Sequence, residues 1–91
     1  MQKSTHSAQY AVLRQRLAAI RKEAGLSQRQ LAVVLRVPHS WVAKVESGER
    51  RIDLVEFGWF CAACDAAPEN EAAGILSAFT RRSRPQRGRR S

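Results

Sequence analysis

The chain has 91 residues, 44% of them apolar, which is enough for one compact domain and excludes a multidomain enzyme. The longest nearly uninterrupted apolar stretch, Phe57 to Cys64, has eight residues, whereas a membrane-spanning helix needs about 20. The first ten residues lack the apolar centre of a signal peptide. We therefore expect a cytoplasmic protein with no membrane partner.

The formal charge of +8 is distributed unevenly along the chain. Residues 81–91 hold six of the 16 basic residues and no acidic one, so residues 1–80 keep 10 basic against 8 acidic groups, a net charge of +2. The tail has no apolar residue to bury, and its composition predicts disorder. The predicted organisation is a flexible leader (1–8), a folded domain (9–80) and a disordered Arg-rich tail (81–91).

The folded part is predicted to be all-α, because no segment alternates apolar and polar residues as a half-buried strand does. A first helix is expected from about Gln9 to Ala24, where Gly25 can end it. Its inward stripe has helical spacing and comprises Leu13, Leu17, Ile20 and Ala24. Ser27 and Gln30 have capping-box spacing, which predicts a second helix starting there. That helix is expected to bury Leu31, Ala32 and Leu35.

A third helix is predicted between Pro38 and Gly48, because proline suits the first turn of a helix and glycine its end. Val42 and Val45, with Val37 just before the helix, form a narrow apolar stripe. The opposite face is predominantly polar and comprises His39, Ser40, Ala43, Lys44 and Ser47. This face is expected to point outward.

Two further helices complete the predicted bundle of five. Asp53 and Glu56 repeat the capping-box spacing. The helix that follows is expected to bury one face, made of Leu54, Phe57, Cys61 and Cys64. Pro68 opens the last helix, near Glu69 to Phe79. Its inward residues are expected to be Ala72, Ile75, Leu76 and Phe79.

The segment 28–46 combines an eight-residue helix, a tight turn and a second short helix with a polar outer face, which is typical of a helix-turn-helix. Through LSQRQLAVVLRVPHSWVAKVESGERR, residues 26–51, the sequence resembles the Cro/repressor-like (XRE-like) family of bacterial and phage regulators. Matching positions are Leu31, Ala32, Leu35, Val37, Val42, Val45, Glu46 and Gly48. Arg36 departs from the pattern, because the family usually has glycine in the turn, where a left-handed backbone is favoured.

The resemblance implies a lambda-repressor-like fold of five short helices in which the third reads double-stranded DNA. It also implies a homodimer on a roughly palindromic operator. His39, Ser40 and Lys44 match the outward residues of the reading helix, and Lys44 could contact a guanine edge or a phosphate. Gln28 matches a phosphate contact at the start of the second helix. A solvated role is the alternative for each.

The resemblance implies further roles around the third helix. Arg50 and Arg51 fall in the segment that the family lays along the DNA backbone, and an intramolecular pair with Glu49 or Asp53 is the alternative. Trp41 adjoins the reading face and could contact a thymine methyl or a sugar, although packing at the domain edge is favoured. The family commonly joins the positions of Arg21 and Glu46 in a largely buried, structural ion pair.

Cys61 and Cys64 have C-x-x-C spacing, but a metal site needs further ligands, and the two histidines of the sequence are His6 in the leader and His39 on the expected outer face of the third helix. We expect reduced core thiols with no metal and no cofactor. No set of Ser, His and Asp and no pair of carboxylates falls where a pocket could form, which predicts a non-enzyme.

Three classes of function remain open: a sequence-specific transcriptional regulator that represses by occupying a promoter; an antitoxin that binds a toxin and represses its own operon; and a non-specific nucleic-acid binder driven by the Arg-rich tail.

Overall fold

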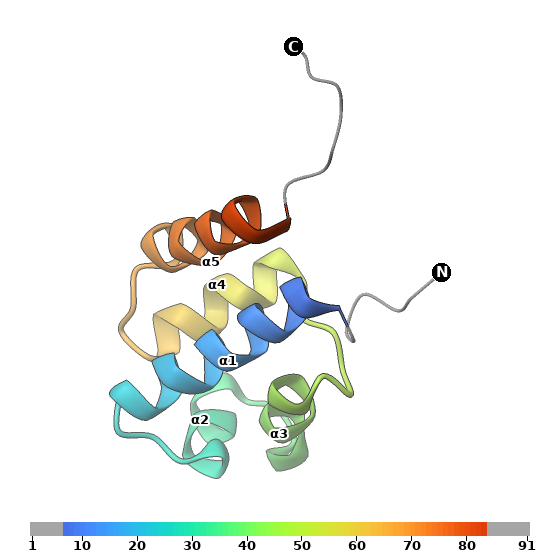
Figure 1. Ribbon diagram of the computed structural model, residues 1–91. Coiled ribbons are helices and arrows are strands. Elements are labelled where there is room, and N and C mark those ends of the chain that lie inside the picture. Colours follow the sequence, from blue (N-terminus) through green and yellow to red (C-terminus); the bar gives the residue numbers. More distant parts are fainter. Residues whose placement is uncertain (1–6, 84–91) are drawn as a thin grey trace.

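The computed structural model describes residues 7–83, which form five α-helices (Figure 1). The helices are α1 (Ala8–Glu23), α2 (Gln28–Leu35), α3 (His39–Ser47), α4 (Leu54–Ala63) and α5 (Pro68–Ser83). The predicted all-α, five-helix architecture is confirmed. Most of the predicted leader, residues 1–6, and most of the predicted tail, residues 84–91, lie outside the described residues.

The helix ends follow the local signals in the sequence. The Ser7 side chain accepts a hydrogen bond from the Tyr10 N–H, so α1 begins at Ala8, one residue earlier than expected. Ser27 and Asp53 each form the predicted capping box, with Gln30 and Glu56 respectively. In each box the N-cap side chain accepts from the N3 N–H and the N3 side chain accepts from the N-cap N–H. These ends are encoded by contacts three residues apart.

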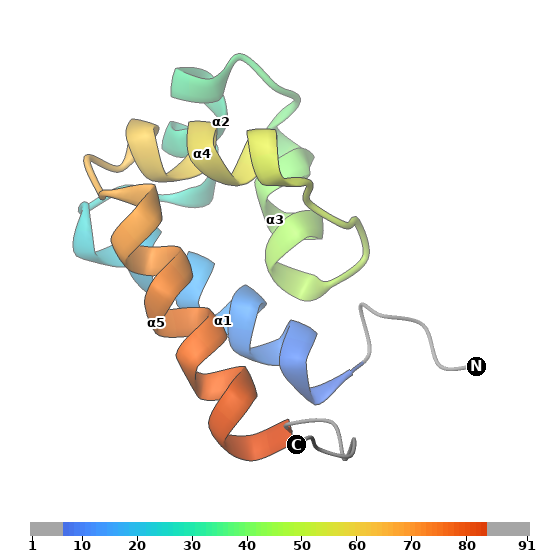
Figure 2. The same ribbon diagram turned by 90° about the horizontal axis from the view of Figure 1, so that it is seen from above.

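The five helices enclose one core. Figure 1 shows α2 and α3 at one end of the molecule, α5 at the other, and α1 and α4 between them. Seen from above, α4 lies over α2, and α5 runs beside α1 (Figure 2). The largest fully buried side chains come from α1 to α4 and are Leu17, Ile20, Leu31, Val42, Val45, Phe60 and Cys61.

Three expected core positions are wrong. Ala24, expected in the inward stripe of the first helix, is the C-cap residue of α1 and is exposed. Leu54, expected inward, is 80% exposed, and the inward-facing aromatic that sequence reasoning missed is Phe60. The buried face of α4 is rotated relative to the expected one and is centred on Phe57, Phe60 and Cys61. In α5, Ile75 is buried as expected, but Leu76 is exposed. The errors at Leu54 and Leu76 fall where α4 and α5 meet.

The last helix extends further than predicted, because α5 continues to Ser83. Residues 81–83, which the sequence analysis assigned to the tail, are thus the last three residues of α5. Arg16 on α1 pairs with two glutamates. Its Nε donates to Glu71 Oε1 at 2.6 Å, which anchors α5 to α1, and the same guanidinium pairs with Glu23 on α1. This contact lowers the pKa of the Glu71 carboxyl, mainly through the hydrogen bond from Arg16.

Candidate nucleic-acid interface

Helices α2 and α3 pack directly against each other across a three-residue turn. The turn bends sharply because Arg36 adopts a left-handed backbone conformation, with φ 60° and ψ 45°. The Val37 N–H then donates to the Ala32 carbonyl at 3.1 Å, which closes the end of α2. The residue that departs from the family pattern thus still takes the conformation that the family's glycine favours.

The two faces of α3 differ in chemistry. Val42 and Val45 are completely buried, whereas His39 and Lys44 are exposed and Ser40 is half-buried. Within the described part of the chain, none of these three polar side chains makes an intramolecular hydrogen bond or ion pair. The structure therefore brings the three predicted base-reading residues together on one outward face, with their polar groups unengaged.

A buried ion pair joins α1 to α3 behind that face. Arg21 Nε donates to Glu46 Oε2 at 2.7 Å, and Arg21 Nη2 donates to Glu46 Oε1 at 3.0 Å. The two side chains are only 9% and 8% exposed. The bond to Glu46 raises the pKa of the Arg21 guanidinium, whose remaining Nη1 donates to the Leu26 carbonyl. Every part of the guanidinium is thus directed at an acceptor.

Gln28 belongs to the same network. Its Nε2 donates to Glu46 Oε1 at 2.9 Å, so one carboxylate connects α1, α2 and α3. Sequence reasoning assigned Gln28 to a phosphate and missed this bond. The two are compatible, because a side-chain amide has two N–H donors and a carbonyl acceptor, and Glu46 uses one donor. Gln28 lies at the first position of α2, where the helix dipole favours an anion.

Arg14 is a further member that sequence reasoning missed. Its Nη1 donates to the Glu46 backbone carbonyl at 3.2 Å, near the C-terminal end of α3. Its Nε is buried without a hydrogen-bond partner among the described residues. The available signal was spacing, because Arg14 and Arg21 are seven residues apart and therefore share a face of α1. Two arginines on that face hold α3 in place.

Arg50 has a different environment from the one expected. Its guanidinium forms two hydrogen bonds with Glu56, at 3.2 and 3.1 Å, so the partner is neither Glu49 nor Asp53. It also lies 5.0 Å from the centre of the Trp41 ring, within the range of a cation–π contact. The bond from Arg50 lowers the pKa of the Glu56 carboxyl. Glu56 lies one turn into α4, so only the folded chain brings it to Arg50.

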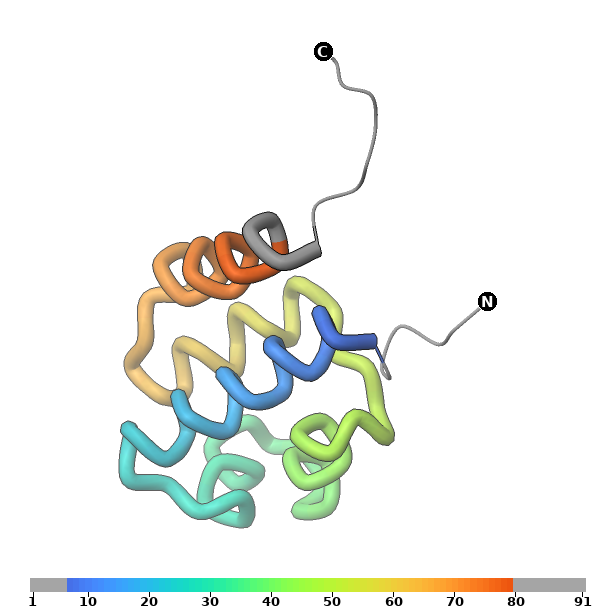
Figure 3. The backbone as a smooth tube through the Cα atoms, in the orientation of Figure 1, coloured from blue at the N-terminus to red at the C-terminus, as the bar shows by residue number. Residues whose placement is uncertain are grey.

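Trp41 and Arg51, the other two residues expected beside Arg50, differ in exposure. Trp41 packs partly against the core, as favoured from the sequence, and its ring supports Arg50. The Arg51 side chain is exposed and forms no ion pair with any residue in 7–83. The Tyr10 hydroxyl accepts from the Ile52 N–H at 3.0 Å, which ties the loop between α3 and α4 to the first turn of α1. Figure 3 shows the backbone path of this loop from α3 to α4. Tyr10 is another contact that the sequence pattern did not indicate.

The two cysteines are buried in the core as free thiols. Burial raises the pKa of the Cys61 thiol to about 11 and also raises that of Cys64, so neither is a thiolate near neutral pH. Within residues 7–83, no three His, Cys, Asp or Glu side chains come close enough together to bind a metal ion. None of the helices described is both long and apolar enough to cross a membrane.

Comparisons with known proteins agree with this geometry. Residues 12–73 match the family described as "Helix-turn-helix domain". The structure is similar to that of an "XRE-family like protein from Pseudomonas syringae pv. tomato str. DC3000", with a TM-score of 0.76 and 36% sequence identity, over 80% of this chain and 89% of that one. Among proteins of curated function, none matches significantly. The chain belongs to the XRE-like helix-turn-helix family and is a DNA-binding domain of that class.

Proposed function

We propose that this protein is a transcriptional regulator that represses by occupying a promoter, and that it binds a palindromic operator as a homodimer. The observation that carries the proposal is the outward face of α3, where His39, Ser40 and Lys44 lie beside a fully buried Val42 and Val45 stripe. Polar side chains without intramolecular partners are available to base edges in a major groove, which admits an α-helix. A non-enzymatic role accords with this class of domain.

In this proposal the residues divide between base reading and backbone positioning. His39, Ser40 and Lys44 read bases, and Lys44 can also reach a phosphate. Gln28 offers its second amide N–H and the first turn of α2 to a phosphate, while Glu46 fixes its orientation. A side chain already held in one rotamer loses less entropy on binding than a free one.

Arg50 and Arg51 are both proposed as phosphate contacts, but they differ in their intramolecular partners. Arg51 is exposed and can meet a phosphate directly. Arg50 must either bind Glu56 and a phosphate at the same time or leave Glu56 to bind the phosphate. The Trp41 ring keeps the Arg50 guanidinium at the edge of the reading face. We therefore expect Arg51 to contribute more to the salt dependence of binding than Arg50. Trp41 acts in this arrangement chiefly through packing.

The experiment that tests the proposal is selection of bound sequences from a random duplex pool. A palindromic consensus is expected. Single alanine variants of His39, Ser40 and Lys44 should then weaken binding by about 1 to 3 kcal/mol each where a base contact is lost, and at least one should relax preference at a defined base. Asn70→Ala, exposed on α5, is the matched control and should leave affinity unchanged. No enrichment, or unchanged affinity in all three variants, would contradict the proposal.

The contacts to the DNA backbone are tested separately, by the salt dependence of binding. Arg51→Gln should weaken binding to all sequences and reduce the salt slope by about one, because one phosphate contact fewer releases one counterion fewer. Arg50→Gln is the matched comparison and should reduce the slope by less. Removal of residues 84–91, which lie outside the described residues, should weaken binding to operator and random duplex by similar factors. Selective loss of operator binding on truncation would instead assign base reading to the tail.

A further inference from the structure

Helix α1 carries three polar side chains on the face that meets α3 and the loop after it. Tyr10, Arg14 and Arg21 are four and seven residues apart, which places them on one face of a helix. Arg21 bonds to the Glu46 carboxylate, Arg14 to the Glu46 backbone carbonyl, and Tyr10 to the Ile52 N–H. One face of α1 therefore contacts both the helix that faces DNA and the segment that follows it.

The two arginine contacts fix α3 itself. They bond to the side chain and to the backbone of Glu46, which lies in the last turn of α3. The Gly48 N–H donates to the Val45 carbonyl and closes the end of this helix. Because α3 is held in these ways without Tyr10, the Tyr10 bond acts on the loop.

The loop of residues 48–53 is bonded to helices at its two ends and at Ile52. The Arg50 N–H donates to the Lys44 carbonyl at 3.0 Å, and the Asp53 N–H donates to Glu56 Oε1 at 3.0 Å. Among the described residues, no backbone group of this loop other than the Ile52 N–H bonds to α1. The Tyr10 hydroxyl is thus the point at which α1 holds the middle of the loop.

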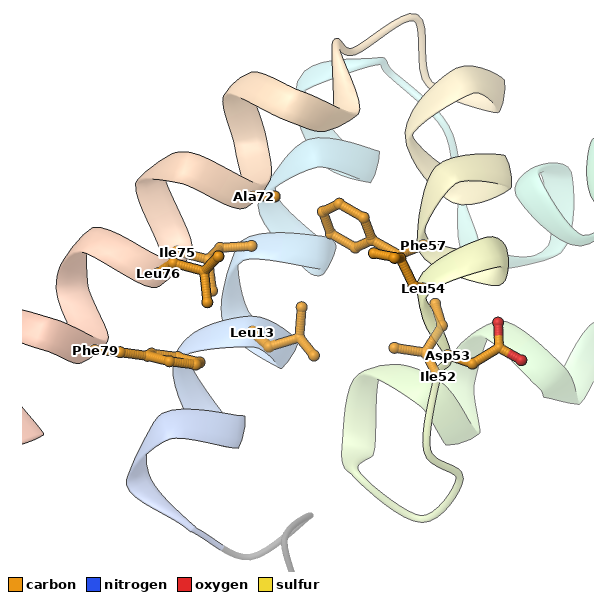
Figure 4. A pocket seen from close by; sticks show the side chains of 9 residues that line it. All are labelled: Leu13, Ile52, Asp53, Leu54, Phe57, Ala72, Ile75, Leu76 and Phe79. Carbon is orange, nitrogen blue, oxygen red and sulfur yellow. The ribbon is translucent and has the colours of Figure 1, made fainter. Parts of the chain in front are cut away.

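The Ile52 side chain adds an apolar contact on the same side. Figure 4 shows Ile52 and Leu13 of α1 pointing toward one another across an apolar cavity of about 250 Å³, while the Asp53 carboxylate points away because it caps α4. A side chain beside an unfilled cavity lacks partner atoms on that side. Packing therefore restrains Ile52 less than the directional bond to Tyr10 does.

One peptide group of the loop is bonded at both of its polar atoms. The carbonyl of Arg51 and the N–H of Ile52 belong to the same planar unit. Arg50 Nη1 donates to that carbonyl at 2.8 Å, and the Tyr10 hydroxyl accepts from that N–H at 3.0 Å. The two bonds fix the plane of this unit, and with it the backbone on the C-terminal side of the Arg51 Cα.

We propose that Tyr10 is a positioning residue for DNA binding, because it fixes the peptide group from which the Arg51 side chain extends toward a phosphate. The role rests on the proposed function, in which Arg51 makes that phosphate contact. Tyr10 acts through Arg51 and needs no contact of its own with DNA. A segment that is ordered before binding loses less entropy when it binds than a mobile one does.

Tyr10→Phe tests this role, because it removes the hydroxyl and keeps the ring. The Kd for a mixed-sequence DNA duplex at low salt is expected to rise about 2- to 10-fold, the cost of ordering one further flexible side chain on binding. The matched control is Ile20→Val, which removes a buried methylene about 15 Å further along α1 and should bind DNA as the wild type does. An unchanged Kd in Tyr10→Phe, or an equal rise in the control, would overturn the proposal.

A double-mutant cycle separates positioning from a direct contact. In an Arg51→Gln background, Tyr10→Phe should weaken binding less than it does in the wild type, because the contact that Tyr10 orders is already lost. Equal weakening in both backgrounds would give Tyr10 its own contact with DNA and overturn the proposal. A purely structural role of Tyr10 would likewise leave the two effects equal.

Hydrogen exchange without DNA tests the ordering of the loop directly. In Tyr10→Phe the Ile52 amide should lose its protection, whereas amides of the buried core, such as that of Leu17, should keep theirs. Equal protection of Ile52 in both proteins would overturn the inference.

Arg51→Gln alone distinguishes a failure of this inference from a failure of the proposed function. If Arg51→Gln weakens binding but Tyr10→Phe does not, the phosphate contact stands and the positioning role fails. If Arg51→Gln binds DNA as the wild type does, the phosphate contact of the proposed function fails, and the positioning role fails with it.

Discussion

Two arginine–glutamate pairs in this molecule have the same chemistry in different surroundings. Arg21 and Arg50 each donate one hydrogen bond to each of the two carboxylate oxygens of one glutamate. The Arg21–Glu46 side chains are 9% and 8% exposed, whereas those of Arg50 and Glu56 are 40% and 17% exposed. Water can take over the role of a lost partner in the second pair but not in the first. Two ion pairs with similar hydrogen-bond geometry are therefore expected to contribute unequally to the free energy of unfolding.

The largest expected effect follows removal of the buried carboxylate. Glu46→Ala should lower the free energy of unfolding by an amount on the order of 3–5 kcal/mol, because it leaves the Arg21 charge buried and unpaired. The amide of Gln28 loses its acceptor as well. Denaturant unfolding measures the change, and Glu49→Ala, exposed three residues further on, should stay within about 0.5 kcal/mol of wild type. A melting temperature unchanged by Glu46→Ala would show that the pair is hydrated.

Replacing both partners sharpens the comparison. The double variant Arg21→Met with Glu46→Leu should be more stable than Glu46→Ala alone, because no charge is left in the interior. It does not regain the bond to the Leu26 carbonyl, so we expect a stability between those of Glu46→Ala and wild type. A double variant less stable than Glu46→Ala would mean that the hydrogen-bond network, not the stranded charge, dominates.

Two substitutions of Arg36 separate the effect of backbone conformation on stability from the effect of charge. It holds a left-handed conformation with φ 60° and forms no ion pair with another residue in 7–83. Arg36→Gly should stabilise the fold by about 0.5–1 kcal/mol, since the left-handed conformation costs about 1–2 kcal/mol for residues with a Cβ, and the entropy of glycine offsets part of the gain. Arg36→Ala removes the charge alone and should change thermal stability much less. Equal effects of the two variants would contradict this explanation.

The exposed pair should contribute least among the individual substitutions. Glu56→Gln removes the charge that pairs with Arg50 but keeps an oxygen for the Asp53 N–H, so the capping box survives. We expect a loss of about 0.2–1 kcal/mol that diminishes with added salt. A salt-independent loss comparable to that of Glu46→Ala would place this pair in the same class as the buried one.

The pH dependence gives the smallest expected effect. Hydrogen bonds from Arg50 and Arg16 lower the pKa values of Glu56 and Glu71. Carboxyls with a lower pKa in the folded state stabilise it above their unfolded pKa of about 4.3, and this contribution is lost as the pH falls through the folded pKa. Stability should therefore decrease between about pH 5 and 3, and Glu71→Gln should flatten this decrease. Unfolding curves at several pH values test it.

The sequence by itself determined the helix count, most helix ends and the polar outer face of α3. Capping boxes at Ser27 and Asp53 could be predicted because their contacts span only three residues. The stripe of α3 could be predicted because its apolar positions fall on one side and its polar positions on the other. The ion pair of Arg21 with Glu46 was implied by the family resemblance rather than by spacing, because its partners are 25 residues apart.

Only the tertiary structure decided which face of α4 is buried. A helix that is apolar on every side has no preferred direction in its pattern, so the spacing could not choose between Leu54 and Phe60. Packing against α2 and α5 made the choice and left Leu54 exposed. The partner of Arg50 was likewise decided by the position of α4, because Glu56 reaches it only after the chain has turned at Asp53. Contacts between elements depend on how helices pack, which the period of a single helix does not contain.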